Sequence, residues 1–158
     1  MMTRIRPLAP RHKSVVMRIL RNSPEFEQQE VQVAEEIIDA YLHDAVNSGY
    51  HIAVAEIDSD VEGYICYGPT PLTKGTWDIY WIAVSPQKKG LGIGKELMYF
   101  AEDSIKRAEG RLVLIETSSK PLYENSRNFY QKRDYELICR IADFYAPKDD
   151  KLIYLKRI

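Results

Sequence analysis

Residues 81–100 read WIAVSPQKKGLGIGKELMYF, and this stretch decides how the rest of the chain is interpreted. A β-branched, apolar run ends at Val84, a turn follows at Ser85 and Pro86, and glycines stand at positions 90, 92 and 94. A helix-like run follows, with Leu97 and Met98 on its apolar side. Glycines let the backbone approach phosphate oxygens, and a helix N-terminus is partly positive. The pattern therefore predicts an anion-binding loop between a strand and a helix.

The motif does not match the two commonest nucleotide-binding loops. A Walker loop requires Ser or Thr after its lysine, whereas Lys95 is followed by Glu96. A dinucleotide fingerprint has the spacing G-x-G-x-x-G in a parallel unit, whereas this spacing is G-x-G-x-G after strands that read as antiparallel. Two frames of a shorter motif remain, Q-x-x-G-x-G from Gln87 and K-x-x-G-x-G from Lys89.

Length and composition indicate one globular domain over residues 1–158. Apolar residues make up 45% and charged residues 28% of the chain, as in ordinary soluble proteins. The formal net charge is -1 with both signs mixed along the chain, so we expect no nucleic-acid partner. No apolar run approaches the roughly 18 residues of a membrane span, so we expect no membrane insertion.

The remaining composition favours a cytoplasmic protein without a metal. The basic start, MMTRIRPLAPRHK, lacks the apolar centre of a secretory signal. Cys66 and Cys139 are isolated in strand-like segments, which is typical of buried, reduced thiols. His12, His43 and His51 show no metal-ligand spacing, so core or surface roles are expected for them.

Hydrophobic periodicity predicts seven strands and four helices. Period-two patterns predict strands over residues 3–8, 50–57, 61–67, 76–84, 111–117, 135–144 and 151–156. Helical patterns predict helices over residues 12–21, 28–47, 92–108 and 123–133. The order β-α-α-β-β-β-α-β-α-β-β joins an antiparallel meander to a β-α-β unit, so we expect an α+β fold with helices on both faces of the sheet.

The glycine loop resembles the acetyl-coenzyme A loop of the GNAT superfamily of N-acetyltransferases. The family writes this region as A-V-x-P-x-x-R-G-x-G-I-G, and Ala83, Val84 and Pro86 align with it. The arginine position then falls on Lys89, which keeps a cation beside the phosphates, so the Lys89 frame is favoured. Downstream, NFYQKRDYE resembles the family's L-Y-E-K-x-G-F-E, with Asp134 at the usual glycine. The resemblance covers nearly the whole chain and implies the GNAT fold, with a mostly antiparallel seven-stranded sheet.

The resemblance also implies which residues hold acetyl-coenzyme A. The strand ending at residues 82–84 is expected to splay from its neighbour and pair with the pantetheine amides, while residues 89–95 hold the pyrophosphate. The implied contacts are Ile82, Ala83, Val84, Lys89, Gly90, Leu91, Gly92, Ile93, Gly94 and Lys95. The family often has Asn seven residues before its tyrosine, where this chain has Tyr123, so we expect Asn125 or Ser126 to replace that contact.

Two aromatic residues are candidates for the reaction site. Tyr130 matches the tyrosine that acts as general acid in many members of the family, near the coenzyme sulfur. The alternative for Tyr130 is a core tyrosine on an apolar helix face. Tyr145 lies in an aromatic turn similar to one in peptide N-terminal acetyltransferases, where it either contacts the acceptor or packs in a hairpin.

Two carboxylates compete for the role of the base that deprotonates the acceptor. Glu116 stands where the ribosomal-protein N-terminal acetyltransferases, which this chain resembles in part, carry a glutamate. Asp78 stands where the histone-acetylating branch places its glutamate, and a water relay is a third option. Strand alternation predicts Asp78, Tyr80, Ile82 and Val84 on one face.

The implied activity is direct transfer of acetyl from acetyl-coenzyme A to a primary amine in a ternary complex, without an acyl-enzyme. The acceptor is either a small amine or a protein amine. A non-catalytic coenzyme A-binding module with the same fold is the alternative. The sequence leaves the acceptor and the oligomeric state open, a homodimer included.

Overall fold

The structure is a computed structural model that describes residues 2–158, and it confirms the predicted order of elements. The strands are β1 (Thr3–Pro7), β2 (His51–Ile57), β3 (Asp60–Pro69), β4 (Thr76–Val84), β5 (Leu112–Ser118), β6 (Glu136–Ala146) and β7 (Asp149–Arg157). The α-helices are α1 (Lys13–Arg21), α2 (Gln28–His43), α3 (Ile93–Arg107) and α4 (Glu124–Gln131). Short 3-10 helices at Pro10–His12, Pro86–Lys88 and Pro121–Tyr123 precede α1, the glycine loop and α4.

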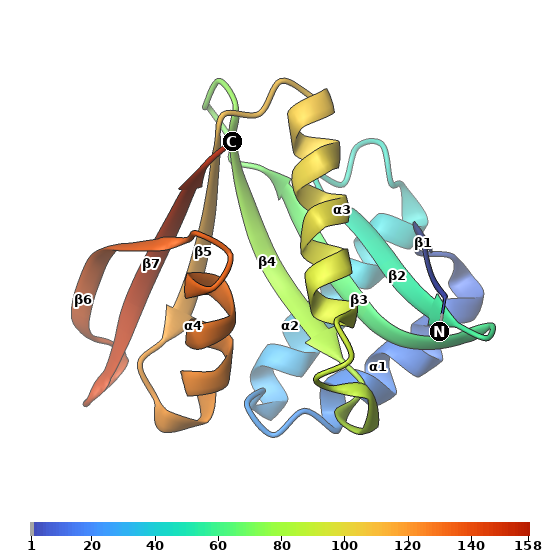
Figure 1. Ribbon diagram of the computed structural model, residues 1–158, viewed down its shortest axis with the longest axis horizontal. Coiled ribbons are helices and arrows are strands. Elements are labelled where there is room, and N and C mark those ends of the chain that lie inside the picture. The colour runs from blue at the N-terminus through green and yellow to red at the C-terminus, as the bar shows by residue number, and fades with distance from the viewer. Residues whose placement is uncertain (1) are drawn as a thin grey trace.

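All seven strands form one open sheet with the order β1-β2-β3-β4-β5-β7-β6 (Figure 1). Within residues 2–158, only β4 and β5 pair in parallel, as the β-α-β unit around α3 requires, so the sheet is mostly antiparallel as expected. The last two strands exchange places relative to chain order, because β7 lies between β5 and β6. The β6–β7 hairpin therefore stands at the edge of the sheet.

Helices cover both faces of the sheet, as the sequence predicts (Figure 1). On one face an apolar core contains Leu97 and Met98 of α3, Tyr130 of α4 and Ile115 of β5. On the other face α1 and α2 bury a second apolar cluster against the central strands, which includes Val16. These two clusters hold the strands that lead to the glycine loop.

β4 and β5 part in the middle of the sheet. Their parallel pairing extends only over Thr76–Ile79 and Leu112–Ile115, although β4 continues to Val84. Beyond Ile79, β4 keeps β3 as its partner on one side, and its backbone on the other side has no β5 partner. The two strands diverge towards the lower end of the molecule in Figure 1, which confirms the expected splay.

A β-bulge in β4 corrects one prediction. Cys66 of β3 pairs with Trp81 and Tyr67 pairs with Ile79, so Tyr80 is an extra residue that reverses the alternation. Ile82 then packs with the α3 side of the sheet, whereas Tyr80 contacts Tyr50 on the α1–α2 side, with 5.5 Å between ring centroids. The prediction that Asp78, Tyr80, Ile82 and Val84 share one face was therefore wrong.

Two smaller predictions also need correction. The helix expected to reach residue 47 ends at His43, because Asp44 leaves helical geometry and its carboxylate accepts hydrogen bonds from Asn47 N (3.2 Å) and Asn47 Nδ2 (2.8 Å). Both cysteines lie in strands, but only Cys66 is buried; Cys139 is half-exposed on β6. Burial raises the pKa of the Cys66 thiol well above its ordinary value, so this thiol is unreactive.

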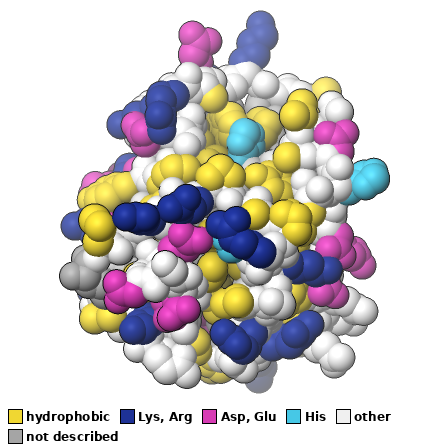
Figure 2. Space-filling view, turned by 90° about the vertical axis from the view of Figure 1, so that its right-hand side faces the viewer, with side chains coloured by type: hydrophobic (Ala, Val, Ile, Leu, Met, Phe, Trp, Pro, Cys, Tyr) yellow, Lys and Arg dark blue, Asp and Glu magenta, His cyan; other side chains and the backbone are white. Residues whose placement is uncertain are grey.

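The described residues contain no helix long and apolar enough to span a membrane. Acidic and basic side chains are interspersed on the face that carries β1, as Figure 2 shows, although Lys and Arg form a band across its middle. The mixed pattern fits the formal net charge of -1.

Candidate functional site

Backbone conformation explains two of the three glycines in the loop. Gly90 has φ +82° and Gly92 has φ +87°, both in the left-handed region that other residues adopt at a cost. Gly92 is the N-cap of α3, and no side chain caps this helix end. The amides of the first turn of α3 therefore point out of the helix without intrahelical partners, an arrangement that can bind an anion.

Gly94 is required for a different reason, which is the contact between α3 and α4. A Cβ on Gly94 would lie 3.1 Å from Phe129 Cε2 and 3.2 Å from Phe129 Cζ, closer than ordinary packing. The glycine thus allows α4 to lie against the start of α3. Tyr130 follows Phe129 on α4, so this close approach also positions Tyr130.

A cavity of about 480 Å³ lies between these elements. It is bounded by the end of β4, the glycine loop, the start of α3, one side of α4 and the segment between α1 and α2. The lining residues that the sequence predicted are Ile82, Ala83, Val84, Lys89, Gly90, Gly92, Ile93, Gly94, Lys95, Asn125, Ser126 and Tyr130. Segments that are far apart in the sequence thus meet around one space.

The cavity distinguishes the two possible frames of the glycine motif. Lys89 lines the cavity, whereas Gln87 lies outside it and its Oε1 accepts a hydrogen bond from Ser85 Oγ at 3.0 Å. This placement favours the frame that starts at Lys89. Leu91 is 50% exposed and is absent from the lining, so the structure does not bring this predicted residue to the cavity.

Tyr130 combines burial with access to the cavity. Only 8% of the residue is exposed, and its ring packs at centroid distances of 5.7 Å from Phe129, 6.4 Å from Tyr135 and 6.1 Å from Tyr154. Burial, followed by the negative charge of Glu25, raises the pKa of Tyr130 well above its ordinary value. The phenol is therefore protonated at neutral pH and can act as a hydrogen-bond donor.

Tyr123, which stands at the family's usual asparagine position, points to a different partner. Its hydroxyl donates to Glu30 of α2, with distances of 3.0 and 3.2 Å to the two carboxylate oxygens. Lys120 Nζ is 2.7 Å from Glu27 Oε1 nearby. The segment before α4 is thus tied to the start of α2, while Asn125 and Ser126 line the cavity.

Asp78 and Glu116 lie on the α1–α2 side of the sheet, on the two strands that part. Thr70 Oγ1 donates to Asp78 Oδ2 at 2.6 Å. Burial raises the pKa of Asp78, the Thr70 hydrogen bond opposes this change, and the charge of Glu116 adds to it. Glu116 is exposed and pairs with Lys151 at 2.8 Å, and its charge contributes, after burial, to raising the pKa of Tyr145 to about 12.

Four cavity residues were missed by sequence reasoning: Glu25, Lys88, Phe129 and Arg133. Lys88 directly precedes the motif that starts at Lys89, so its position in the sequence could have indicated it. Phe129 and Arg133 flank Tyr130 on the chain, and the Arg133 guanidinium lies 3.6 Å from the Phe129 ring centroid. Glu25 carries no local signal, because it reaches the cavity through tertiary structure alone.

The comparisons with known proteins agree with this geometry. The model of the acetyltransferase (GNAT) family matches residues 15–135. A GNAT-family protein from Desulfovibrio desulfuricans shares 35% identity over 99% of both chains, with a TM-score of 0.95. A search of curated proteins finds no match.

Two more distant structures share the fold alone. The ribosomal-protein-S18-alanine N-acetyltransferase of Escherichia coli is 14% identical, over 99% of this chain and 94% of that one, with a TM-score of 0.79. An aminoglycoside 6'-N-acetyltransferase complexed with coenzyme A is 16% identical, over 98% and 96%, with a TM-score of 0.77. The family match over most of the chain and the 35% identical structure settle the assignment: the chain belongs to the GNAT family of acetyltransferases.

Proposed function

We propose that the protein is an N-acetyltransferase that moves acetyl from acetyl-coenzyme A to a primary amine by direct attack in a ternary complex. One observation carries the proposal: a single cavity connects the glycine loop to Tyr130 at the place where β4 and β5 part. The loop end suits an anionic donor and the Tyr130 end suits the chemistry of its leaving group. A structural neighbour complexed with coenzyme A supports the identity of the donor.

The residues around the cavity fit acetyl-coenzyme A. The first-turn amides of α3 and the Lys88, Lys89 and Arg133 side chains offer donors and positive charge to a pyrophosphate. The β4 backbone beyond Ile79 has no β5 partner, so its free groups can pair with pantetheine amides as an added strand would. Gly90 and Gly92 leave the loop open, since a Cβ on either would meet no atom within 4 Å.

Bound acetyl-coenzyme A supplies the reactive thioester, and the protein must supply a neutral amine beside it. A lysine-like amine with a pKa near 10.4 costs roughly 4.6 kcal/mol to deprotonate at pH 7, whereas an α-amino group with a pKa near 7.8 costs only about 1 kcal/mol. We propose Asp78 or Glu116, directly or through water, as the base. The raised pKa of Asp78 makes it the better match to a proton acceptor.

We assign to Tyr130 the role of donor to the departing thiolate. Its protonated phenol faces the same cavity as the β4 end, and a hydrogen bond to a developing anion is stronger than one between neutral groups. After Tyr130 gives its proton to the thiolate, the phenolate takes up a proton from solvent. The acetyl group passes directly to the amine nitrogen.

A thiol-release assay tests the proposal. Purified protein is mixed with acetyl-coenzyme A and a panel that contains an alanine-initiated peptide, an Nα-blocked lysine peptide, spermidine and kanamycin. Amine-dependent thiol release, with an acetylated product of the expected mass, supports N-acetyl transfer. Tight coenzyme A binding without release from any amine would instead indicate a non-catalytic binding module.

A further inference from the structure

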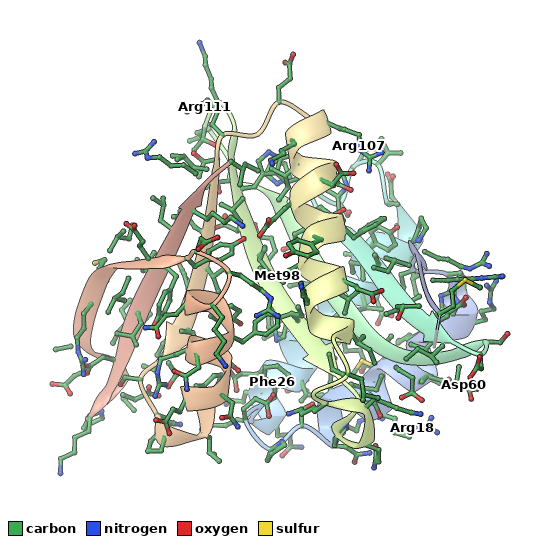
Figure 3. All side chains as sticks on the ribbon, viewed as in Figure 1. Arg18, Phe26, Asp60, Met98, Arg107 and Arg111 are labelled. Atoms are coloured by element: carbon green, nitrogen blue, oxygen red, sulfur yellow. The ribbon has the colours of Figure 1, made fainter. Side chains whose placement is uncertain are left out.

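The strongest group without an assigned role is the Glu25 carboxylate. Glu25 lies in the segment between α1 and α2 and lines the same cavity as Lys89 and Tyr130. Its neighbour Phe26 is labelled in the lower part of Figure 3, between α4 and the loop that precedes α3 in this view. A carboxylate from the segment between α1 and α2 thus lines the cavity in which the donor is proposed to bind.

The segment that carries Glu25 is held firmly on both sides. Ser23 is 2% exposed, and its hydroxyl donates to Ile19 O at 2.8 Å. Phe26 packs against the α1–α2 core, and Phe26 N donates to Ser23 O at 3.2 Å. Glu27 N donates to Glu30 Oε2 at 2.8 Å and starts α2. Glu25 is therefore presented by an ordered turn.

Glu25 has only partial charge compensation. Its side chain is 13% exposed, and its Oε1 lies 3.8 Å from Lys89 Nζ. That distance is too long for a hydrogen bond, and a largely buried carboxylate without a close partner is unfavourable. Glu25 can therefore still bind a cation that approaches more closely than Lys89 does.

Lys89 faces two anions once the donor binds. The glycine motif places Lys89 beside the expected pyrophosphate, yet in the free protein the same ammonium lies nearest to Glu25. The pyrophosphate carries more charge than one carboxylate and draws the lysine towards the loop. Glu25 then loses its counter-charge inside a confined cavity, and an incoming ammonium can replace it.

We propose that Glu25 binds the ammonium of the acceptor, and that Lys89 neutralises Glu25 until the donor pyrophosphate takes the lysine away. The inference rests on the proposed function, because it deepens the acceptor side of that reaction. It predicts ordered binding, in which the donor enters first and creates the acceptor's cation site. It also predicts an acceptor that arrives protonated, with its proton then removed by the base.

The test uses the whole protein with Glu25→Gln and a matched control, Glu27→Gln. Both variants remove one negative charge from the same segment, but Glu27 lies outside the cavity lining and pairs with Lys120. With the best acceptor of the amine panel, Glu25→Gln should raise the acceptor KM at least tenfold, and Glu25→Asp should recover part of the loss. Glu27→Gln should stay within about twofold of the wild type. An unchanged acceptor KM in Glu25→Gln would overturn the ammonium site.

A calorimetric measurement with coenzyme A alone tests the Lys89 step without turnover. Glu25→Gln should bind coenzyme A at least threefold more tightly, because Lys89 is released, and this gain should vanish when Lys89→Met is already present. A gain that persists without Lys89, or no gain, overturns the competition. If no amine on the panel releases thiol from the wild type, the proposed function fails and the ammonium site with it, whereas the coenzyme A cycle still decides the competition.

Discussion

Replacing Tyr130 by Phe isolates its hydroxyl from its packing. Phe keeps the ring, and with it the contacts to Phe129, Tyr135 and Tyr154 at centroid distances of 5.7, 6.4 and 6.1 Å. The apolar surroundings that raise the pKa of Tyr130 also accept a phenyl ring without a lost partner. We therefore expect the free energy of unfolding to change by less than about 1 kcal/mol, measured by urea denaturation.

The same substitution should have a large effect on turnover. A hydrogen bond to a charged group contributes about 1.5–3 kcal/mol, which corresponds to a kcat loss of roughly 10- to 160-fold. Full general-acid catalysis would extend the loss to between about 10²- and 10⁴-fold. We expect kcat to fall at least tenfold in the thiol-release assay, while the coenzyme A Kd changes little.

The pH dependence provides a second readout for Tyr130. Its active form is the protonated phenol, and burial raises its pKa above the ordinary value of 10.0. Activity that depends on this proton is present below the raised pKa and is lost as pH rises through it. We therefore expect Tyr130 to cause no fall in kcat between about pH 6 and pH 9.

Tyr154→Phe is the matched control, because Tyr154 is 1% exposed in the same aromatic group but lies outside the cavity lining. It should retain kcat within about twofold, whatever it does to stability. If Tyr130→Phe, folded and able to bind coenzyme A, also keeps kcat within twofold, the assignment of Tyr130 as proton donor is refuted.

Four further substitutions test the base, the glycine loop and the core. Because burial raises the pKa of Asp78 above 3.8, base activity should fall as pH falls through that raised value. Asp78→Asn should remove this acidic limb from the kcat/KM profile and Glu116→Gln should keep it; the reverse assigns Glu116, and a limb that survives both rejects both. Gly92→Ala, at φ +87°, should lower the free energy of unfolding by about 1–2 kcal/mol in urea and weaken coenzyme A binding in calorimetry; unchanged binding would contradict the loop assignment. Lys156→Met should cost about 3 kcal/mol in the same urea assay, because Glu102 is 6% exposed and loses the ammonium 2.9 Å away; a cost under about 1 kcal/mol would show that Tyr135 alone satisfies the carboxylate.

Local sequence signals predicted most of the fold. The β4 bounds Thr76–Val84 match the predicted strand, and Asp134 adopts φ +65° at the position where the family usually has glycine. Both features depend on residues close in the chain, through apolar alternation and through the tolerance of Asp for the left-handed region. The glycine loop was predictable for the same reason, since its conformation is set by its own residues.

What the sequence missed depends on side-chain hydrogen bonds and packing that hydrophobic periodicity does not report. Asp44 looked like one more helical residue until its carboxylate accepted hydrogen bonds from Asn47. Tyr123 stands at the family's asparagine position, and no sequence signal indicated that its hydroxyl donates to Glu30 in the distant helix α2. Glu25 reaches the cavity only because α2 packs across the sheet from α4. No periodicity or spacing encodes such contacts.

The bulge at Tyr80 has the largest consequence for the proposed chemistry. It leaves Asp78 on the α1–α2 side of the sheet and turns Ile82 and Val84 towards α3 and the donor cavity. A regular strand would put the candidate base and the donor-facing residues on one side. With the bulge, base and donor lie on opposite faces, and they can meet only where β4 leaves β5 after Ile79. For Asp78 to act as the proposed base, an acceptor must enter from the α1–α2 side and present its amine through this gap.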